Sequence, residues 1–279
     1  MIVKLAADKR RSTQIENTET CFALSKLFLK RAMWLGASLL AAAVPALPAA
    51  QRVEKIDQQP RVVTPGAMPG QPPSDAVVLF DGKDAAEWAY RDGRPAQWPV
   101  VNGALVSKSG TGNIYTKRKF GSAQIHVEFA TPDMPNAHGQ ARGNIGVYLQ
   151  GRYEIQILDS FNNPTYSNGS CGSLYGQYAP LVNVSRPPKE WQTYDIVFHA
   201  PRCWADRQVA TPGTVTVLQN GVLVLDGATI QGRTTSSDDT DVCEDAPLML
   251  QDHYHPDVKE TFMQFRNIWI RPLTAEISK

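Results

Sequence analysis

Residues 143–160, GNIGVYLQGRYEIQILDS, contain a carboxylate and an amide at spacings that place both on one face of a strand. Glu154 and Gln156 alternate with Ile155 and Ile157, and successive side chains of a strand point to opposite faces. The apolar face is expected to join the core. A carboxylate recessed among amides and phenols has a raised pKa, which suits it to proton transfer near neutral pH.

Polar residues also alternate with apolar ones in two other segments. AQIHVEFA at 123–130 places Glu128 on its polar face, and LMLQDHYH at 248–255 places Gln251 and His253 on alternate positions. Amides, carboxylates, imidazoles and phenols are groups that bind sugar hydroxyls. We therefore predict a polar groove on one sheet, the alternative being ordinary exposure of these side chains to solvent.

The elements that must position these residues are strands. Apolar residues recur with a period of two almost everywhere after residue 76, and TVTVLQNGVLVLD at 214–226 is typical of a hairpin because Asn220-Gly221 favours a two-residue turn. About ten to thirteen short strands and no sustained helical period predict an all-β fold. We expect one domain, a jelly-roll sandwich of two antiparallel sheets.

The N-terminal region has the pattern of an export signal. Residues 32–50, AMWLGASLLAAAVPALPAA, follow a basic segment and end in small residues. The apolar run, about 16 residues, is shorter than the ~20 that span a bilayer. We expect residues 1–50 to be a signal peptide and the protein to be periplasmic or secreted, with no stable membrane anchor. A permanent anchor and a start downstream of Met1 are the alternatives.

The rest of the chain divides by composition. Residues 51–75 are rich in proline and poor in large apolar residues, which predicts a disordered linker. The jelly-roll domain is expected over 76–274, with a short tail at 275–279. The 28 basic and 27 acidic residues are nearly balanced, and the basic residues are mostly scattered, so nothing indicates the concentrated basic surface that a nucleic-acid partner requires.

Three cysteines remain after removal of the expected signal. Cys203 and Cys243 lie in polar, loop-like stretches, so we predict a disulfide between them, as an oxidising compartment permits. Cys171 is then a free thiol, expected to be buried rather than catalytic. His253, His255 and Asp257 in DHYHPD have the residue types of a metal site, but a polar loop is the favoured interpretation.

Six segments, taken in order along the chain, resemble one family. They are LFDGKDAAEWAY, GNIGVYLQGRYEIQILDS, CGSLYGQYAP, RPPKEWQTYDIVFHAPR, VTVLQNGVLV and LQDH…FRNIWIRPL. Together they resemble the 3-keto-disaccharide hydrolase domain family over about residues 77–273. The resemblance implies a concanavalin-like jelly roll. It also implies cleavage of a glycoside whose glucosyl C3 is already a ketone. The expected binding partner of the protein is therefore a carbohydrate substrate.

The implied chemistry assigns roles to the candidate residues. A base takes the acidic C2 proton, an acid serves the glycosidic oxygen, and donors or a divalent metal ion stabilise the C3 oxygen. The expected catalytic residues are Glu154, His253 and Glu128. The expected substrate-binding residues are Tyr148, Gln150, Arg152, Gln156, Asn144, Gln251 and Arg266. The metal and its ligands are not identified by the sequence.

Two alternatives remain at this point. Glu128 and Glu154 are also the pair that an ordinary glycosidase with two carboxylates requires, and a non-catalytic carbohydrate-binding jelly roll needs only the binding groups. The chain departs from the family pattern where residues 254–264, YHPDVKETFMQ, separate LQDH from FRNIW. This insertion leaves the choice of sugar and linkage open.

Overall fold

The computed structural model describes residues 59–253 and 262–273, and nearly all regular structure in them is β-strand. Fifteen strands occur there, more than the ten to thirteen expected, because several loops pair over only two residues. The two exceptions are the single 3-10 turns η1 (Gly139–Ala141) and η2 (Ser167–Gly169). The antiparallel sandwich predicted from the period-two pattern is therefore confirmed.

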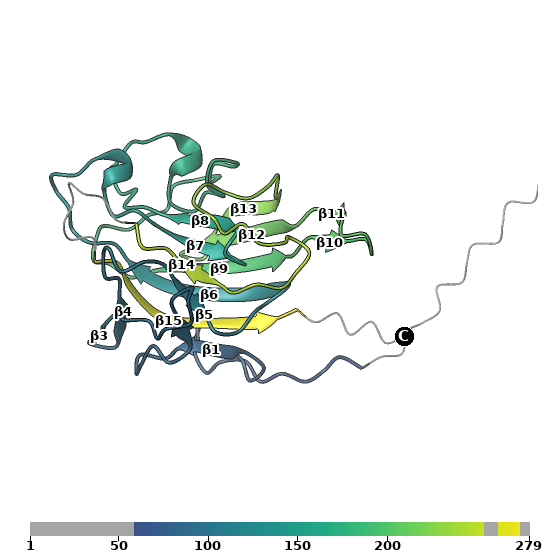
Figure 1. Cartoon of the computed structure of the whole chain (residues 1–279). Coiled ribbons are helices and arrows are strands. Elements are labelled where there is room, and N and C mark those ends of the chain that lie inside the picture. The colour runs from purple at the N-terminus through teal and green to yellow at the C-terminus, as the bar shows by residue number, and fades with distance from the viewer. Residues whose placement is uncertain (1–58, 254–261, 274–279) are drawn as a thin grey trace, which may run out of the picture. The chain divides into compact units, whose positions relative to one another are not determined.

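The larger sheet has eight strands, all antiparallel to their neighbours. Figure 1 shows five of them stacked in order from β13 to β15. In sheet order the strands are β13 (Val222–Thr229), β12 (Thr214–Gln219), β9 (Gln192–His199), β6 (Ala123–Ala130), β15 (Gln264–Pro272), β4 (Ala104–Val106) and β3 (Val100–Val101), with β1 (Val77–Phe80) also paired to β15.

The smaller sheet has five strands and carries the hairpin of residues 143–160 at one edge. Its order is β2 (Trp88–Ala89), β5 (Ile114–Thr116), β14 (Met249–Leu250), β7 (Ile145–Leu149) and β8 (Tyr153–Ile157). Residues 150–152 connect β7 to β8, and Gln150 and Gly151 among them have positive φ angles of 54° and 65°. Asn220 and Gly221 turn β12 into β13 in the same way, with φ angles of 53° and 79°, as the sequence predicts.

The core lies between the two sheets. Ile155 and Ile157 of β8 pack there together with Val127 and Phe129 of β6, and all four are fully buried. Apolar side chains alternate with polar ones along these strands, so burial of one set forces the other set onto the outer faces. Glu154 therefore lies on the outer face of the five-stranded sheet, and Glu128 lies on the outer face of the eight-stranded sheet.

Part of the predicted linker is packed rather than disordered. The compact unit begins at Pro60, and residues 60–75, here called the strap, lie on β15. The Gly70 carbonyl accepts hydrogen bonds from Asn267 and Trp269, both 2.8 Å long. The strap contains few large apolar residues, and polar contacts of this kind hold it instead. Residues 1–58, which include the expected signal peptide, lie outside the described residues.

The expected disulfide is present. Cys203 and Cys243 are bonded, with their Cα atoms 5.7 Å apart, and Cys171 is free and buried. The bond joins a separate two-stranded hairpin, β10 (Arg202–Cys203) and β11 (Val209–Thr211), to residues 231–247. These residues, which connect β13 to β14, are called the cover loop below.

Candidate active site

Glu154 lies in a row of side chains that crosses the outer face of the five-stranded sheet. The strand register places Tyr148 opposite Glu154, Met249 opposite Tyr148 and Tyr115 opposite Met249. Residues directly opposite each other in antiparallel strands have adjacent side chains on one face. Tyr115, Tyr148 and Met249 accordingly form a buried cluster separate from the main core. Four strands thus bring one carboxyl group and two phenols together.

The Tyr148 hydroxyl is the centre of a hydrogen-bond network. It lies 2.8 Å from Oε2 of Glu154 and 3.1 Å from the carbonyl oxygen of Thr235, and it accepts a hydrogen bond of 3.1 Å from Nε2 of Gln251. A phenol has one proton, so it donates to one of the two acceptors at a time. It donates to Glu154 when that group is ionised, and to Thr235 when Glu154 carries the proton.

Burial has the largest effect on the pKa of the Glu154 carboxyl group, because the residue is only 4% exposed. It raises the pKa of Glu154 to about 7, although the hydrogen bond from Tyr148 acts in the opposite direction. Burial, followed by the nearby Glu154 charge, also raises the pKa of Tyr148, which therefore keeps its proton. The pair consists of a carboxyl group that titrates near neutral pH and a phenol that does not.

A second row lies beside the first. Gly146 is opposite Gln156 in the strand register. The carbonyl oxygen of Gly146 accepts a hydrogen bond from the backbone N–H of Gln251. A Cβ atom at Gly146 would lie 2.4 Å from Oε1 of Glu154, so only glycine leaves room for the carboxyl group there. The side-chain amide oxygens of Gln156 and Gln251 are buried and have no hydrogen-bond partner among the described residues. Such oxygens are acceptors for ligand hydroxyls.

Loop residues surround the two rows. Oε1 of Gln140 lies 3.2 Å from Nε2 of Gln156 and 3.3 Å from Nδ2 of Asn144, so these amides form one chain. The hydroxyl groups of Tyr166 and Tyr175 are 2.6 Å apart, and burial followed by the bond to Tyr175 raises the pKa of Tyr166. Both tyrosines belong to the glycine- and asparagine-rich segment 159–176 that follows the hairpin.

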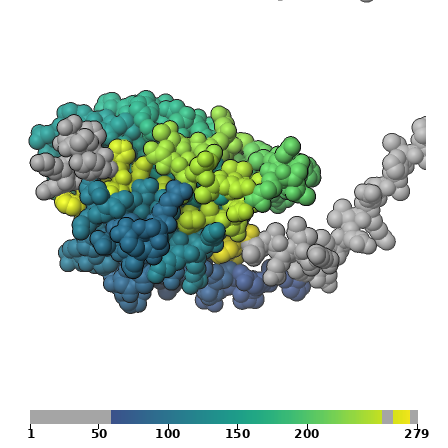
Figure 2. Space-filling view, in the orientation of Figure 1, coloured from purple at the N-terminus to yellow at the C-terminus, as the bar shows by residue number. Residues whose placement is uncertain are grey.

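The cover loop crosses the row from the other side. Thr234 accepts a hydrogen bond of 3.0 Å from the Glu154 backbone, and Asp238 accepts bonds from Arg91 and Tyr115. Figure 2 shows this yellow-green segment on the near face, between the blue segment around β2 and β5 and the teal segment above it. The outer face of the hairpin is consequently buried, which excludes the alternative of a plain solvated sheet.

Five of the predicted site residues lie in the two rows and the loops beside them, in two hydrogen-bonded groups. They are Glu154, Tyr148, Gln156, Gln251 and Asn144. Gln150 and Arg152 share the hairpin but support the loops instead. The fully buried Arg152 donates to the hydroxyl of Thr240 and to the carbonyl of Glu244, and Gln150 donates to the carbonyl of Phe120.

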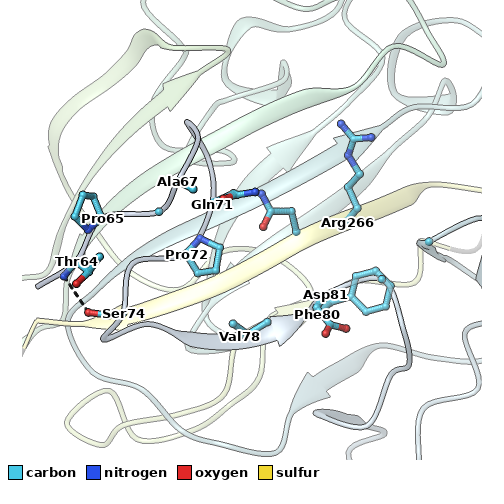
Figure 3. Close-up of a pocket in the computed structure, with 14 residues that line it drawn as sticks. Thr64, Pro65, Ala67, Gln71, Pro72, Ser74, Val78, Phe80, Asp81 and Arg266 are labelled. Carbon is cyan, nitrogen blue, oxygen red and sulfur yellow. Dashed lines mark hydrogen bonds between the residues drawn. The ribbon is translucent and has the colours of Figure 1, made fainter.

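The structure does not bring Glu128 and Arg266 to this site. They form an ion pair of 2.6 Å on the outer face of the eight-stranded sheet, and the Arg266 guanidinium stacks 4.1 Å above the Trp191 ring. A cavity of about 710 Å³ lies nearby, between the strap and β1. Figure 3 shows Arg266 among the residues that line that cavity, together with Val78 and Asp81. Arg266 therefore braces Glu128 rather than lining a sugar site with Glu154.

Two further expectations concern His253 and a metal site. His253 is half-buried and follows Gln251 by two positions, whereas His255 and Asp257 lie outside the described residues. No group of three or more His, Cys, Asp and Glu residues is placed to hold a metal ion within 59–253 and 262–273. The same segments contain no helix long and apolar enough to cross a membrane.

Several groups at the site are not singled out by the sequence pattern. Tyr115, Gln140, Tyr166, Tyr175 and the Thr235 carbonyl all reach the site from other strands or loops. The segment that contains Tyr166 and Tyr175 was recognisable as a binding loop, because it flanks the hairpin. Nothing in the local pattern around Thr235 indicates that its carbonyl meets a phenol 87 positions away.

Comparison with known structures supports the fold described above. A provisionally assigned glycosyl hydrolase from Parabacteroides distasonis is 44% identical, with a TM-score of 0.71 over 78% of this chain and 93% of its own. A second such protein from the same organism is 19% identical, with a TM-score of 0.54 over 72% and 94%, and shows the fold alone. None of the curated proteins compared with the chain matches it.

The match to a family model covers most of the described residues. Residues 75–271 match the 3-keto-alpha-glucoside-1,2-lyase-like domain, which agrees with the resemblance seen in the sequence. Both the fold and the polar site lie within that range. This chain therefore belongs to the 3-keto-disaccharide hydrolase family and is a carbohydrate-active protein with a jelly-roll fold.

Proposed function

We propose that the protein cleaves 3-keto glycosides and that Glu154 is the base. One observation carries the proposal: a recessed carboxyl group with a pKa of about 7 lies 2.8 Å from a protonated phenol. A base with a pKa near the working pH combines a useful ionised fraction with sufficient basicity. The family match supports a 3-keto substrate.

The reaction follows from the acidity of the C2 proton beside the C3 ketone. Glu154 takes this proton, and the electron pair of the C–H bond forms an enolate across C2, C3 and the C3 oxygen. Re-formation of the ketone then breaks the bond from C1 to the glycosidic oxygen, which leaves with a proton. Water adds its oxygen to C1 and a proton returns to C2, giving the 3-keto sugar.

The network around Tyr148 is suited to this transfer. When Glu154 gains the proton, the Tyr148 hydroxyl turns its own hydrogen from Glu154 to the Thr235 carbonyl, 3.1 Å away. Gln251 donates to the phenol oxygen in both states. No buried polar group of this set loses its partner during the transfer, which avoids a desolvation cost of about 1–3 kcal/mol per group.

The two-carboxylate glycosidase is disfavoured by the fold. Its carboxyl groups must lie roughly 5–10 Å apart and face one substrate. Glu128 and Glu154 lie on opposite outer faces of a sandwich whose sheets pack about 10 Å apart, with the core between them. Two aromatic side chains that could serve as platforms of a binding module lie away from the site, because Tyr153 is in the core and Trp269 contacts the strap.

The test uses a 3-keto disaccharide and its unoxidised parent in D2O. Turnover of the keto form alone, with deuterium at C2 of the released 3-keto sugar, is the expected result. A sample of product incubated without enzyme corrects for spontaneous exchange. Turnover of both substrates with protium retained at C2 indicates direct hydrolysis, and binding without turnover indicates a carbohydrate-binding module.

Export belongs to the same proposal, because a periplasmic or secreted location gives access to external glycosides. Expression of the full chain should yield a mature protein shortened by about 45–50 residues. Mass spectrometry of the purified product identifies its N-terminus. An intact Met1 in a cytoplasmic fraction contradicts export without affecting the chemistry proposed for Glu154.

A further inference from the structure

The row that contains Glu154 continues beyond the edge of the sheet. β8 is the last strand of the five-stranded sheet, and Leu174 forms an antiparallel bridge with Ile155 on its free side. The next residue, Tyr175, donates its backbone N–H to the Glu154 carbonyl at 3.0 Å. This register places Tyr175 directly opposite Glu154.

The side chains of Tyr175 and Glu154 lie on the same face. Leu174 and Ile155 are fully buried in the core, so alternation turns Tyr175 to the outer face, as it turns Glu154. Residues directly opposite each other in antiparallel strands have Cβ atoms roughly 4.5–5.5 Å apart. Glu154 therefore lies between two phenols, with Tyr148 on one side and Tyr175 on the other.

The two phenols differ in their access to solvent. Tyr148 is fully buried, and its hydroxyl bonds Glu154 or Thr235. Tyr175 is half-buried, and Tyr166, whose hydroxyl contacts it, is 49% exposed. A ligand can therefore reach the row at its Tyr175 end without entering the buried part beneath the cover loop.

The hydroxyl groups of Tyr166 and Tyr175 form a pair that leaves one hydrogen for a ligand. They are 2.6 Å apart, so one of their two hydrogens lies between the oxygens. Burial and then the bond to Tyr175 raise the pKa of Tyr166, and the charge of Glu154 adds to both effects. Tyr166 accordingly keeps the shared hydrogen, and the hydrogen of Tyr175 is available to a ligand oxygen.

The backbone holds this pair in place. The Gly176 N–H donates to the Asn168 carbonyl at 2.9 Å, and the Asn168 side-chain amide donates to the Gly176 carbonyl at 3.2 Å. These two bonds join the segments that carry the two tyrosines. The pair is thus fixed beside Glu154 by the chain itself.

From the register, the exposure and the hydroxyl pair, we propose that Tyr175 is the general acid that protonates the glycosidic oxygen. Tyr166 is its hydrogen-bond partner. The assignment rests on the proposed function, because it completes the elimination that Glu154 begins. C2 and the glycosidic oxygen are both bonded to C1, so a base and an acid that act on them must be neighbours, as Glu154 and Tyr175 are.

One negative charge passes through the site. It moves from Glu154 to the enolate when Glu154 takes the C2 proton. As the bond between C1 and the glycosidic oxygen breaks, its electron pair stays on that oxygen, which takes the Tyr175 proton. The charge is then on the Tyr175 phenolate, which accepts a charge-assisted hydrogen bond from Tyr166 and faces a neutral Glu154. When water adds, its oxygen bonds to C1, the phenolate takes one water proton, and Glu154 returns its proton to C2.

The experiment varies the leaving group. A 3-keto disaccharide releases a basic sugar alkoxide that needs a proton, whereas p-nitrophenyl 3-keto glucoside releases a stable phenolate that does not. Tyr175→Phe is expected to lower kcat/KM at least ~100-fold on the disaccharide and less than about threefold on the aryl substrate. Tyr166→Phe should show the same dependence with a loss of about tenfold, the effect of one hydrogen bond to a charged group.

Tyr178→Phe is the matched control. Tyr178 lies three positions further along the same segment, and its hydroxyl accepts a hydrogen bond from Gln231 instead. Both substrates should be cleaved by this variant at close to the wild-type rate. Thermal unfolding verifies that each variant folds, and if Tyr175→Phe does not, the substrate dependence of Tyr166→Phe decides.

The outcomes separate the two proposals. Equal losses in Tyr175→Phe on both substrates, or no loss on either, overturn the general acid and leave the proposed function intact. A substrate dependence in Tyr178→Phe equal to that in Tyr175→Phe also overturns it. A wild-type protein inactive on both substrates overturns the proposed function and the general acid with it. Loss on both substrates in Glu154→Gln, with loss on the disaccharide alone in Tyr175→Phe, supports both.

Discussion

Glu128 and Glu154 are both glutamates at polar positions of period-two strands, yet their surroundings differ. Glu128 accepts hydrogen bonds of 2.6 Å from Arg266 and 2.8 Å from Asn267. Burial raises its pKa, but these bonds and that of His126 outweigh burial and lower the pKa to about 2. Glu154 is bonded to a phenol instead of a cation, and burial raises its pKa to about 7.

The contrast shows what separates a carboxylate fixed in ion pairs from one that can exchange a proton near neutral pH. Near Glu128, His126 also binds Asp195 at 2.7 Å, and its ring stacks on Trp269. Burial lowers the pKa of His126, but Asp195 and Glu128 outweigh it and raise the pKa to about 9. This outer face is a set of fixed charges beneath the strap. The face that carries Glu154 holds one titrating group among neutral partners.

Matched substitutions test the contrast most strongly. Glu154→Gln is expected to lower the rate on a 3-keto glycoside by at least ~100-fold, the usual scale for a lost acid–base group. Glu128→Gln should leave the rate within about twofold, because it lies on the opposite face. Initial rates of aglycone release measure both. A larger loss in Glu128→Gln than in Glu154→Gln reverses the assignment.

Gly146→Ala tests the positions of the carboxyl group and of its phenol partner. The added Cβ atom would lie 2.4 Å from Oε1 of Glu154 and 2.5 Å from Cε2 of Tyr148, so both side chains must move. A displacement on this scale is expected to lower the rate by about 10–100-fold. Rates and thermal unfolding are compared with those of Gly103→Ala, where nothing lies within 4 Å of the added atom but the positive φ of 76° strains alanine, so this variant controls for lost stability away from the site. Full activity in Gly146→Ala shows that the carboxyl position is not critical.

The pH dependence of kcat/KM sharpens the role of the Tyr148 bond. Glu154 acts as a base only when ionised, so the rate should rise with pH through about 7. Tyr148→Phe removes a bond that lowers this pKa, so the midpoint should move to higher pH. A profile that falls through this range identifies an acid rather than a base. Retention of the wild-type midpoint in Tyr148→Phe contradicts the network described for Glu154.

The smallest expected effect is on stability. The folded pKa of Glu128 lies below its ordinary value of 4.5, so its contribution is present above pH 4.5 and is lost as pH falls towards 2. Glu128→Gln should lower Tm at pH 7 by about 4–8 °C, the effect of about 2 kcal/mol in a domain of this size. The difference from wild type should shrink at low pH.

Glu154 contributes a pH dependence of stability opposite in sign to that of Glu128, and it therefore serves as an internal control. Its folded pKa lies above 4.5, so its ionised form destabilises the fold and stability is lost as pH rises through about 7. Glu154→Gln should therefore keep or raise Tm at pH 8. Thermal unfolding of both variants across this pH range tests the contrast. Equal Tm losses in the two variants at pH 8 contradict it.

Much of the fold was predictable because it depends on local patterns. Alternation in β6, β8, β9 and β12 identifies which residues face the core, and Asn220-Gly221 identifies a turn. In β15 the local sequence pattern does not predict the strand geometry. Asn267, with a φ angle of 45°, adds a residue to the strand, so Arg266 and Asn267 both bind Glu128. Such a bulge depends on how the strand pairs with its partner strand, and the alternation of apolar residues in the sequence does not indicate it.

The sequence by itself determined the class of fold, the polar face of the hairpin and the residue types for proton transfer at Glu154. It also identified Cys203 and Cys243 as the pair available for a disulfide. These properties depend on alternation, turn chemistry and composition, which act between near neighbours. The resemblance to a family added the class of substrate.

Only the tertiary structure decided which polar residues share a site. Glu128 and Glu154 look alike in sequence, but the sheet order places them on opposite faces of the core. The strand register then sets Tyr148 against Glu154 and Met249 against Tyr115, and the cover loop brings in Thr235. The physical reason is that a pKa and a hydrogen bond depend on neighbours in space, and these are chosen by strand pairing across long separations in the chain.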